Sequence, residues 1–144
     1  MTTALNIIQI TPFIHVANLE AALSFFNDIL GFKTLFRASN YAYVQRETAG
    51  VRILESHAED GSPHRAHGGF AYYIDVRDVD AIYAELKSKL ETLAPEHVTG
   101  PVDQEYNQRE LMIRAPDGNV FVFGQAIARQ PHGPSASRFG ERSG

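Results

Sequence analysis

The sequence predicts an α+β domain built from two copies of a strand, a helix and three further strands, arranged with pseudo-twofold symmetry. One observation is a repeat: Val16-Ala17-Asn18-Leu19-Glu20-Ala21 returns sixty residues later as Val76-Arg77-Asp78-Val79-Asp80-Ala81. The other is a hairpin pattern, in which residues 109–114 and 119–124 flank Ala115-Pro116-Asp117-Gly118. Asp-Gly in such a turn is typical of a β-hairpin. We expect a helix to cover the convex face of each curved sheet, and the concave faces to enclose a cavity together.

Length and composition agree with one domain. The chain has 144 residues, of which 44% are hydrophobic, enough for a single core. We expect the domain to span residues 1–126, with module one at about 5–57 and module two at about 69–126. The stretch between the modules is polar and contains Gly and Pro, as surface connections do. Residues 127–144 are rich in Pro, Gly, Ser and Arg without periodicity, which predicts a flexible C-terminal tail.

Charge and cysteine content exclude several classes of function. The net charge is −4 and the basic residues are scattered, so the chain lacks the footprint of a nucleic-acid-binding protein. An acidic protein suits a cationic or neutral ligand. The absence of cysteine excludes disulfides, thiolate nucleophiles and cysteine-ligated zinc. No signal-peptide pattern and no membrane-length apolar run occurs, so we expect a cytoplasmic protein that does not bind membranes.

The elements of the first module follow from local patterns. β-branched residues predict a strand over residues 6–16, in which Pro12 removes a ladder donor and favours an edge or a bulge. Asn18 is a suitable N-cap for a helix over residues 19–30, and Gly31 suits the left-handed position after it. Three short strands are then expected at residues 32–37, 41–46 and 51–56, with Ala49-Gly50 before the last.

The second module repeats this order. Residues 70–76 predict a strand, and Asp78 caps a helix whose apolar stripe ends at Leu90. In the hairpin, alternation separates two faces. One face carries Leu111, Ile113, Phe121 and Phe123, and the other Glu110, Met112, Val120 and Val122. Because Glu110 lies on the second face, we expect that face to line a cleft.

Three segments carry a resemblance to a known family. The stretch TPFIHVANLEAALSFFNDILGF resembles the first strand, helix and Leu-Gly-Phe exit of the vicinal oxygen chelate superfamily, which includes glyoxalases, bleomycin-resistance proteins and dioxygenases. The stretch DQEYNQREL and the hairpin resemble its bleomycin-resistance branch, and the resemblance covers roughly residues 7–126. It implies a homodimer whose ligand clefts are shared between subunits and whose N-terminal strand can be exchanged around a proline. Pro12 could serve that role, or it could be a simple edge-strand proline.

Enzymes of this superfamily place metal ligands on the first and last strands of each module. The equivalent positions here are Thr11, Ala71 and Val122, and Glu55 is a candidate for the fourth. Alanine and valine have no donor atom, whereas a divalent-metal site needs three or four convergent ligands. We therefore expect no metal and no other cofactor. The resemblance then implies a non-catalytic protein that binds and sequesters a drug of the bleomycin type.

Strand alternation nominates the residues that would touch a ligand. We expect Phe13 and Tyr73 to stack on a flat aromatic group, and Glu55, Asp75 and Glu110 to pair with a cationic end. Tyr106 falls where the family has an aromatic loop residue near the cleft. The expected ligand-binding residues are Phe13, His15, Glu55, Tyr73, Asp75, Tyr106, Glu110, Met112 and Val122. For the aromatic residues the alternative is a place in the core, and for the carboxylates an internal ion pair with Arg109 or Arg114.

An enzyme is the second hypothesis. His15 falls on the repeat position of Asp75, so the two could act as base and orienting carboxylate in a metal-independent or atypical-metal reaction. His57, His64 and His67 lie around the connection between the modules and match no standard metal motif, so we interpret them as solvated loop residues. A structural or partner-binding module is the third hypothesis.

Overall fold

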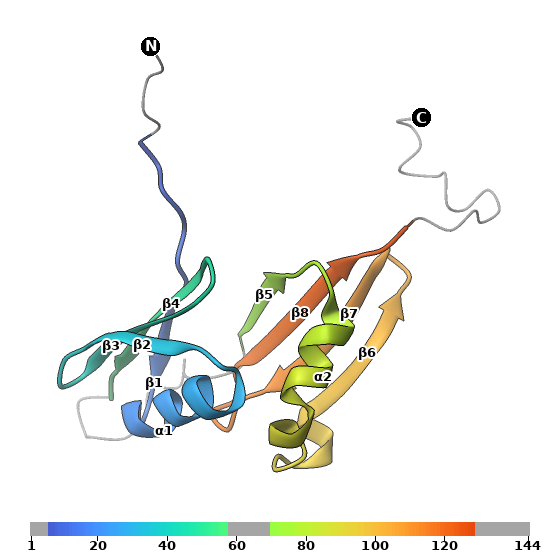
Figure 1. The fold of residues 1–144 in the computed structure, drawn as a ribbon. Helices are drawn as coiled ribbons and strands as arrows, with labels where there is room; N and C mark the ends of the chain where they lie inside the picture. The colour runs from blue at the N-terminus through green and yellow to red at the C-terminus, as the bar shows by residue number, and fades with distance from the viewer. Residues whose placement is uncertain (1–5, 58–69, 129–144) are drawn as a thin grey trace.

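The structure is a computed structural model, and it describes residues 6–57 and 70–128. It contains two four-stranded sheets of the same topology (Figure 1). The first sheet has the order β1-β4-β3-β2, and the second has the order β5-β8-β7-β6. The strands are β1 (Phe13–Val16), β2 (Lys33–Arg37), β3 (Tyr41–Arg46), β4 (Ala49–Glu55), β5 (Ala71–Asp75), β6 (Val98–Gln104), β7 (Gln108–Arg114) and β8 (Val120–Ala126).

Each module has the predicted strand–helix–three-strand order. In both, the first strand pairs in parallel with the last, and the other pairs are antiparallel. The prediction of a paired βαβββ architecture in the α+β class is therefore confirmed. The expected connection between the modules and the expected flexible tail lie almost wholly outside the described residues, so both stay predictions.

Both helices begin at the residues that the sequence predicts. Helix α1 (Leu19–Ser24) is capped by Asn18, whose Oδ1 accepts a hydrogen bond from the Ala21 N–H at 2.9 Å. Helix α2 (Val79–Leu90) is capped in the same way by Asp78. Helix α1 continues as a π-helix over Phe25–Ile29, and Gly31 follows with a φ of 79°. A residue without a Cβ suits this left-handed position.

Each helix covers one face of its own sheet, and the two cores join (Figure 1). Alternation buries Ile14 and Val16 of β1 under α1, and buries Leu111 and Ile113 of β7 on the α2 side. Phe121 of β8 connects the modules because its ring lies 6.0 Å from that of Phe25 and 5.2 Å from that of Phe26. The buried residues of the two modules therefore form one continuous core.

Three elements differ from the expected boundaries. The first strand begins only at Phe13, and Ile8 and Ile10 before Pro12 are each 92% exposed. Strand β4 begins at Ala49, because the turn before it is made by Glu47, which has a φ of 53°. Strand β6 had no sequence signal of its own, since Gly100-Pro101 interrupts it and it pairs with β7 across a register shift. None of the helices in residues 6–57 and 70–128 is long and apolar enough to span a membrane.

Candidate functional site

The face of the second sheet that α2 does not cover contains a carboxylate beneath two tyrosines. Glu110 is 4% exposed, although it is on the face opposite the core residues Leu111 and Ile113. Tyr73 donates a hydrogen bond to its Oε2 at 2.9 Å, and Tyr106 lies 2.9 Å from Oε1 and 3.0 Å from Oε2. Both rings are open to solvent, at 45% and 60% exposed. We call Tyr73, Tyr106, Gln108 and Glu110 the acidic cluster.

Local backbone features assemble the acidic cluster. Glu110 pairs with Gly124 across β7 and β8, and a Cβ at Gly124 would overlap the hydroxyl and ring of Tyr73. The missing side chain therefore lets the Tyr73 ring reach Glu110. Tyr106 is brought back over the sheet by the β6–β7 turn, in which Asn107 has a φ of 64°. Asparagine tolerates this conformation better than most residues.

The hydrogen bonds keep both tyrosines protonated. Burial raises the pKa of Tyr73, and the hydrogen bond to Glu110 raises it further. The pKa of Tyr106 is also raised, chiefly by its hydrogen bond to Glu110 and then by loss of hydration. A phenol that donates to a carboxylate becomes a stronger acceptor through its own oxygen. The cluster therefore presents negative potential and two aromatic surfaces, which suit a cationic or N–H-bearing aromatic group.

The corresponding face of the first sheet is aromatic. The ring of Phe13 lies 5.5 Å from that of His15 and 6.3 Å from that of Tyr41, and Phe36 lies 6.0 Å from Tyr41. Phe13 is 51% exposed. We call Phe13, His15, Phe36 and Tyr41 the aromatic face. It has room for stacking but holds no carboxylate of its own among these residues.

Arg52 supplies a positive charge beside the aromatic face. Its Nη1 donates to the Tyr41 hydroxyl at 2.7 Å and its Nε donates to the Thr11 hydroxyl at 2.9 Å. Its guanidinium carbon lies 5.1 Å from the centre of the Tyr43 ring. A guanidinium stacked on an aromatic ring and bonded at both ends is held in one place. The two uncovered sheet faces therefore carry opposite charges.

The structure brings five of the expected ligand residues together. Tyr73 pairs with Val122, and Val122 pairs with Met112, so these residues lie side by side on the face of the acidic cluster with Glu110 and Tyr106. Asp75 lies at the end of β5 opposite Gly124 and is exposed. Phe13 and His15 lie on the other sheet. Among the described residues no hydrogen bond or ring contact joins the aromatic face to the acidic cluster.

Glu55 lies at the end of β4, beside the start of α1. Its Oε1 accepts the backbone N–H of Leu19 at 2.8 Å, at the start of α1, and this hydrogen bond lowers the pKa of its carboxyl. Phe13 and Tyr73 are equivalent in the repeat. Phe13 pairs with Arg52, and Tyr73 pairs with Val122. Arg52 therefore has the place on β4 that Val122 has on β8, and the role of Glu55 in binding a ligand stays a prediction. Within residues 6–57 and 70–128 no three His, Asp or Glu side chains converge as metal ligands would.

The histidines are dispersed. His15 Nδ1 lies 3.2 Å from the Ser56 hydroxyl, and in the described parts of the chain no hydrogen bond joins His15 to Asp75. His57 lies 3.3 Å from Glu55. His64 and His67 fall outside the described residues. The pairing of His15 with Asp75 as base and orienting group stays a prediction.

Sequence reasoning did not find four residues of these faces: Phe36, Tyr41, Arg52 and Gln108. Tyr41 and Tyr43 alternate with the buried Ala42 and Val44, so period-two alternation could have placed their rings on the uncovered face. The Oε1 of Gln108 lies 3.0 Å from the Tyr73 hydroxyl, as a second acceptor beside Glu110. Nothing local in the sequence indicates this contact, because the two residues come from different strands.

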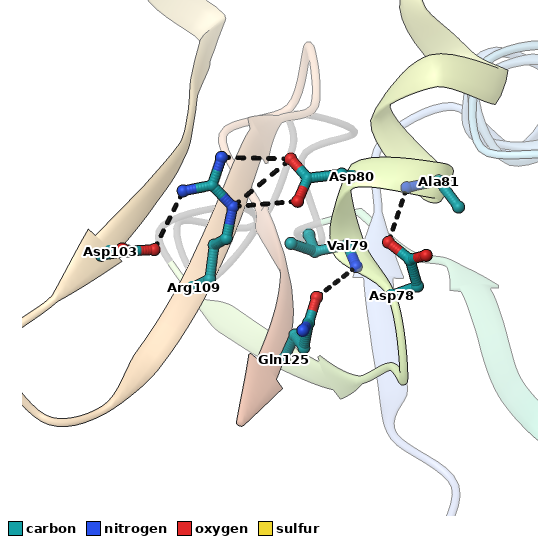
Figure 2. A network of polar contacts seen from close by, with 7 residues as sticks. All are labelled: Asp78, Val79, Asp80, Ala81, Asp103, Arg109 and Gln125. Atoms are coloured by element: carbon teal, nitrogen blue, oxygen red, sulfur yellow. Dashed lines mark hydrogen bonds and ion pairs between the residues drawn. The ribbon is translucent and has the colours of Figure 1, made fainter. Parts of the chain in front are cut away.

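Hydrogen bonds and ion pairs of Arg109 and Gln125, which we call the polar brace, hold β7 in position (Figure 2). Arg109, the neighbour of Glu110, donates to Asp80 at the start of α2 and to Asp103 on β6. These two carboxylates raise the pKa of the guanidinium, that of Asp80 most. Gln125 of β8 accepts the backbone N–H of Val79 at 2.9 Å. The brace ties the helix start to the strands on either side of Glu110.

Comparison with known proteins agrees with this geometry. The sequence profile of the Glyoxalase/Bleomycin resistance protein/Dioxygenase superfamily matches residues 6–123. The bleomycin-binding protein of Streptomyces verticillus, solved with copper(II)-bleomycin, has a TM-score of 0.65 and 22% identity, covering 87% of this chain and 100% of that chain. A bleomycin resistance determinant encoded on the transposon Tn5 has a TM-score of 0.68 and 18% identity, with coverage of 85% and 100%.

TnmS3, an antibiotic-binding protein from a Streptomyces species, has a TM-score of 0.62 and 22% identity, with coverage of 85% and 99%. At these identities the structural likeness shows a common fold. The profile match extends over most of the chain, and the chain therefore belongs to the glyoxalase/bleomycin resistance protein/dioxygenase superfamily.

Proposed function

We propose that this protein binds and sequesters a small aromatic molecule with a cationic group, without chemistry, and that a bleomycin-type antibiotic is the best candidate. The observation that carries the proposal is the acidic cluster, in which the buried carboxylate of Glu110 lies beneath two exposed tyrosine rings. A cation that pairs with a buried carboxylate gains more interaction free energy than a cation that pairs with a carboxylate in bulk water. The tyrosine rings offer a surface on which an aromatic group can stack. The superfamily contains bleomycin-binding proteins of the same fold.

A homodimer would complete the site. The aromatic face and the acidic cluster lie on different sheets, and no interaction joins them in the described residues. Arg52 gives the first face a positive charge, whereas Glu110 and Asp75 give the second a negative one, so the faces of two copies are complementary. We propose that each cleft combines the aromatic face of one subunit with the acidic cluster of its partner, as the family resemblance implies.

The segment before β1 offers a test of this dimer. Ile8 and Ile10 are almost fully exposed on one chain, which suits a segment that packs on a partner after exchange around Pro12. Ile8→Glu with Ile10→Glu should weaken the dimer without changing the fold of the subunit. Sedimentation and circular dichroism measure these two outcomes. A dimer that these substitutions leave unchanged would indicate that Pro12 is a simple edge-strand proline.

A metal-independent or atypical-metal enzyme is the second candidate, because His15 lies on an uncovered sheet face next to the Ser56 hydroxyl. A histidine held by a hydroxyl can act as a base when a substrate lies against it. Turnover abolished by His15→Ala, or stoichiometric bound metal, would favour this candidate. Tight binding without product would favour sequestration.

Isothermal titration of the purified protein with metal-free and with copper-loaded bleomycin tests the proposal. We expect saturable sub-micromolar binding of about one ligand per subunit, with the drug recovered intact. No binding at tens of micromolar would contradict the antibiotic assignment. Modified drug in the recovered sample would contradict sequestration.

Two matched variants locate the site. Glu110→Gln removes the charge but keeps the shape, and we expect bleomycin affinity to fall about tenfold or more. Glu91→Gln makes the same change after the last turn of α2, where the carboxylate pairs with Lys87 at the surface, and should leave affinity unchanged. Equal effects of both variants would show that net charge, and not the acidic cluster, controls binding.

A further inference from the structure

Arg52 lies in the middle of the uncovered face of the first sheet. It pairs with Phe13 on β1 and with Tyr43 on β3, and Phe36 on β2 pairs with Tyr43 in turn. Residues that pair across neighbouring strands point to the same side of a sheet, so these four side chains form one row. In the second module the place of Arg52 belongs to Val122. The charge in the row is therefore particular to the first module.

The guanidinium of Arg52 is held by uncharged groups. Its Nε donates to the Thr11 hydroxyl and its Nη1 to the Tyr41 hydroxyl, while its carbon lies over the Tyr43 ring. A guanidinium has five N–H groups. The two hydrogen bonds use two of these groups. Both N–H groups of Nη2 and one of Nη1 therefore have no acceptor among the residues that the structure describes.

The charge of Arg52 also has no carboxylate beside it in the described parts of the chain. By contrast, Arg37, Arg46 and Arg109 each form an ion pair with a carboxylate. Arg52 is exposed, so a ligand can reach its remaining N–H groups. An oxyanion is the group that both accepts these hydrogen bonds and compensates the charge.

The rings in the same row favour an oxyanion that is attached to a flat ring. Phe13 and Phe36 are 51% and 57% exposed, so each offers open aromatic surface. A planar ring gains by stacking on such a surface, whereas an inorganic phosphate or sulfate has no apolar part that could use it. The charge thus selects an acidic group, and the rings select an aromatic one.

We propose that Arg52, Phe13 and Phe36 form a binding site for a planar aromatic carboxylate. The carboxylate accepts hydrogen bonds from the free N–H groups of Arg52, and the ring of the ligand packs against the two phenylalanines. This site goes beyond the proposed function, which assigns the cationic group of its ligand to the acidic cluster. It needs neither Glu110 nor a second subunit.

Ligand-observed NMR titration with 2-naphthoate tests the site, and 2-naphthamide is the matched neutral probe. We expect saturable binding of naphthoate and about fivefold weaker binding of naphthamide, the ratio typical of one exposed ion pair. Equal affinities would overturn the role given to Arg52, and absence of saturable naphthoate binding would overturn the site. This comparison uses the wild-type protein alone, so it does not depend on the folding of any variant.

Variants locate the naphthoate site. Arg52→Gln should weaken naphthoate binding about fivefold and leave naphthamide binding unchanged. Arg77→Gln removes the same charge from another exposed position, before α2, and should change neither. Equal losses of naphthoate affinity in both variants would show that net charge controls binding and would overturn the proposal.

Phe13→Ala tests the aromatic part of the site. It should weaken naphthoate and naphthamide binding alike, because both probes lose the same stacking surface. A Phe13→Ala protein that binds both probes as wild type does would overturn the place given to the ring. No bleomycin is present in these titrations, so failure of this proposal and failure of the bleomycin titration are distinguishable.

Discussion

Glu55 and Gln125 occupy equivalent places at the ends of β4 and β8, and each accepts the first backbone N–H of its module's helix. The Glu55 carboxylate bonds the Leu19 N–H at 2.8 Å, and the Gln125 amide oxygen bonds the Val79 N–H at 2.9 Å. The first N–H groups of a helix have no partner within it. The last strand of each module therefore supplies a hydrogen-bond acceptor for the first N–H group of its helix. The acceptor is a charged carboxylate in the first module and a neutral amide in the second.

Replacing Glu55 tests this role. Glu55→Gln should keep the hydrogen bond, as Gln125 does, and change the free energy of unfolding little at neutral pH. Glu55→Ala should cost about 1 kcal/mol, the usual value for losing a side-chain cap. Denaturant unfolding of the three proteins measures this. Equal losses in both variants would show that the charge and not the hydrogen bond matters.

The same residue predicts a pH dependence. Because the Leu19 N–H lowers the pKa of Glu55 in the folded state, its stabilisation is present above the ordinary value near 4.5 and is lost as pH falls through the lower folded value. The stability difference between wild type and Glu55→Ala should therefore shrink on acidification. Glu55→Gln should show no such loss at this position. Unfolding curves over an acid series measure both.

Gly124→Ala should disturb the acidic cluster. The new Cβ would displace the Tyr73 ring, which is exposed enough to swing away, so we expect a loss of about 1 kcal/mol and of the hydrogen bond to Glu110. In a Tyr73→Ala background the same substitution should cost much less, because the overlapping ring is gone. Chemical denaturation of the double-mutant cycle measures the coupling. Additive losses would contradict the contact.

Alkaline titration should separate the two tyrosines. Tyr73 and Tyr106 are expected to ionise above the ordinary value of 10, so their stabilisation is present below that pH and lost above it. In Glu110→Gln we expect the pKa of Tyr106 to fall further than that of Tyr73. The hydrogen bond to Glu110 is the main cause of the raised pKa of Tyr106, whereas burial is the main cause for Tyr73. Tyrosinate absorbance, compared with Tyr106→Phe and Tyr73→Phe, measures this. Unchanged titration in Glu110→Gln would contradict the assigned hydrogen bonds.

The stability that the polar brace contributes should depend on the forked shape of the Arg109 guanidinium. Arg109→Lys keeps the charge but cannot reach Asp80 and Asp103 together with its single ammonium group, so we expect a lower melting temperature than for wild type. Arg109→Ala should lower it further at low salt, with a smaller difference at high salt. Thermal melts in both buffers measure this. The control is Arg114→Lys, at the exposed end of the same strand, which should melt like wild type.

The repeat of Val16-Ala17-Asn18-Leu19 as Val76-Arg77-Asp78-Val79 determined the architecture, because caps and helix starts depend on neighbours along the chain. Alternation in the hairpin likewise placed Glu110 opposite the core. These are local properties. By contrast, the repeat predicts a third strand after α2 but does not place it along the chain, since the pairing partner of β6 decides which segment becomes a strand.

Local patterns thus predicted the two modules and the faces of their strands, and the motifs that resemble a known superfamily indicated the family. Only the tertiary structure decided which side chains meet: that Glu55 bonds the start of α1, that Arg52 pairs with Phe13, and that Gly124 leaves room for Tyr73 over Glu110. These contacts join residues far apart in the chain, and their partners follow from strand register and turn length. A change of one residue in a turn shifts that register, which no single segment reveals.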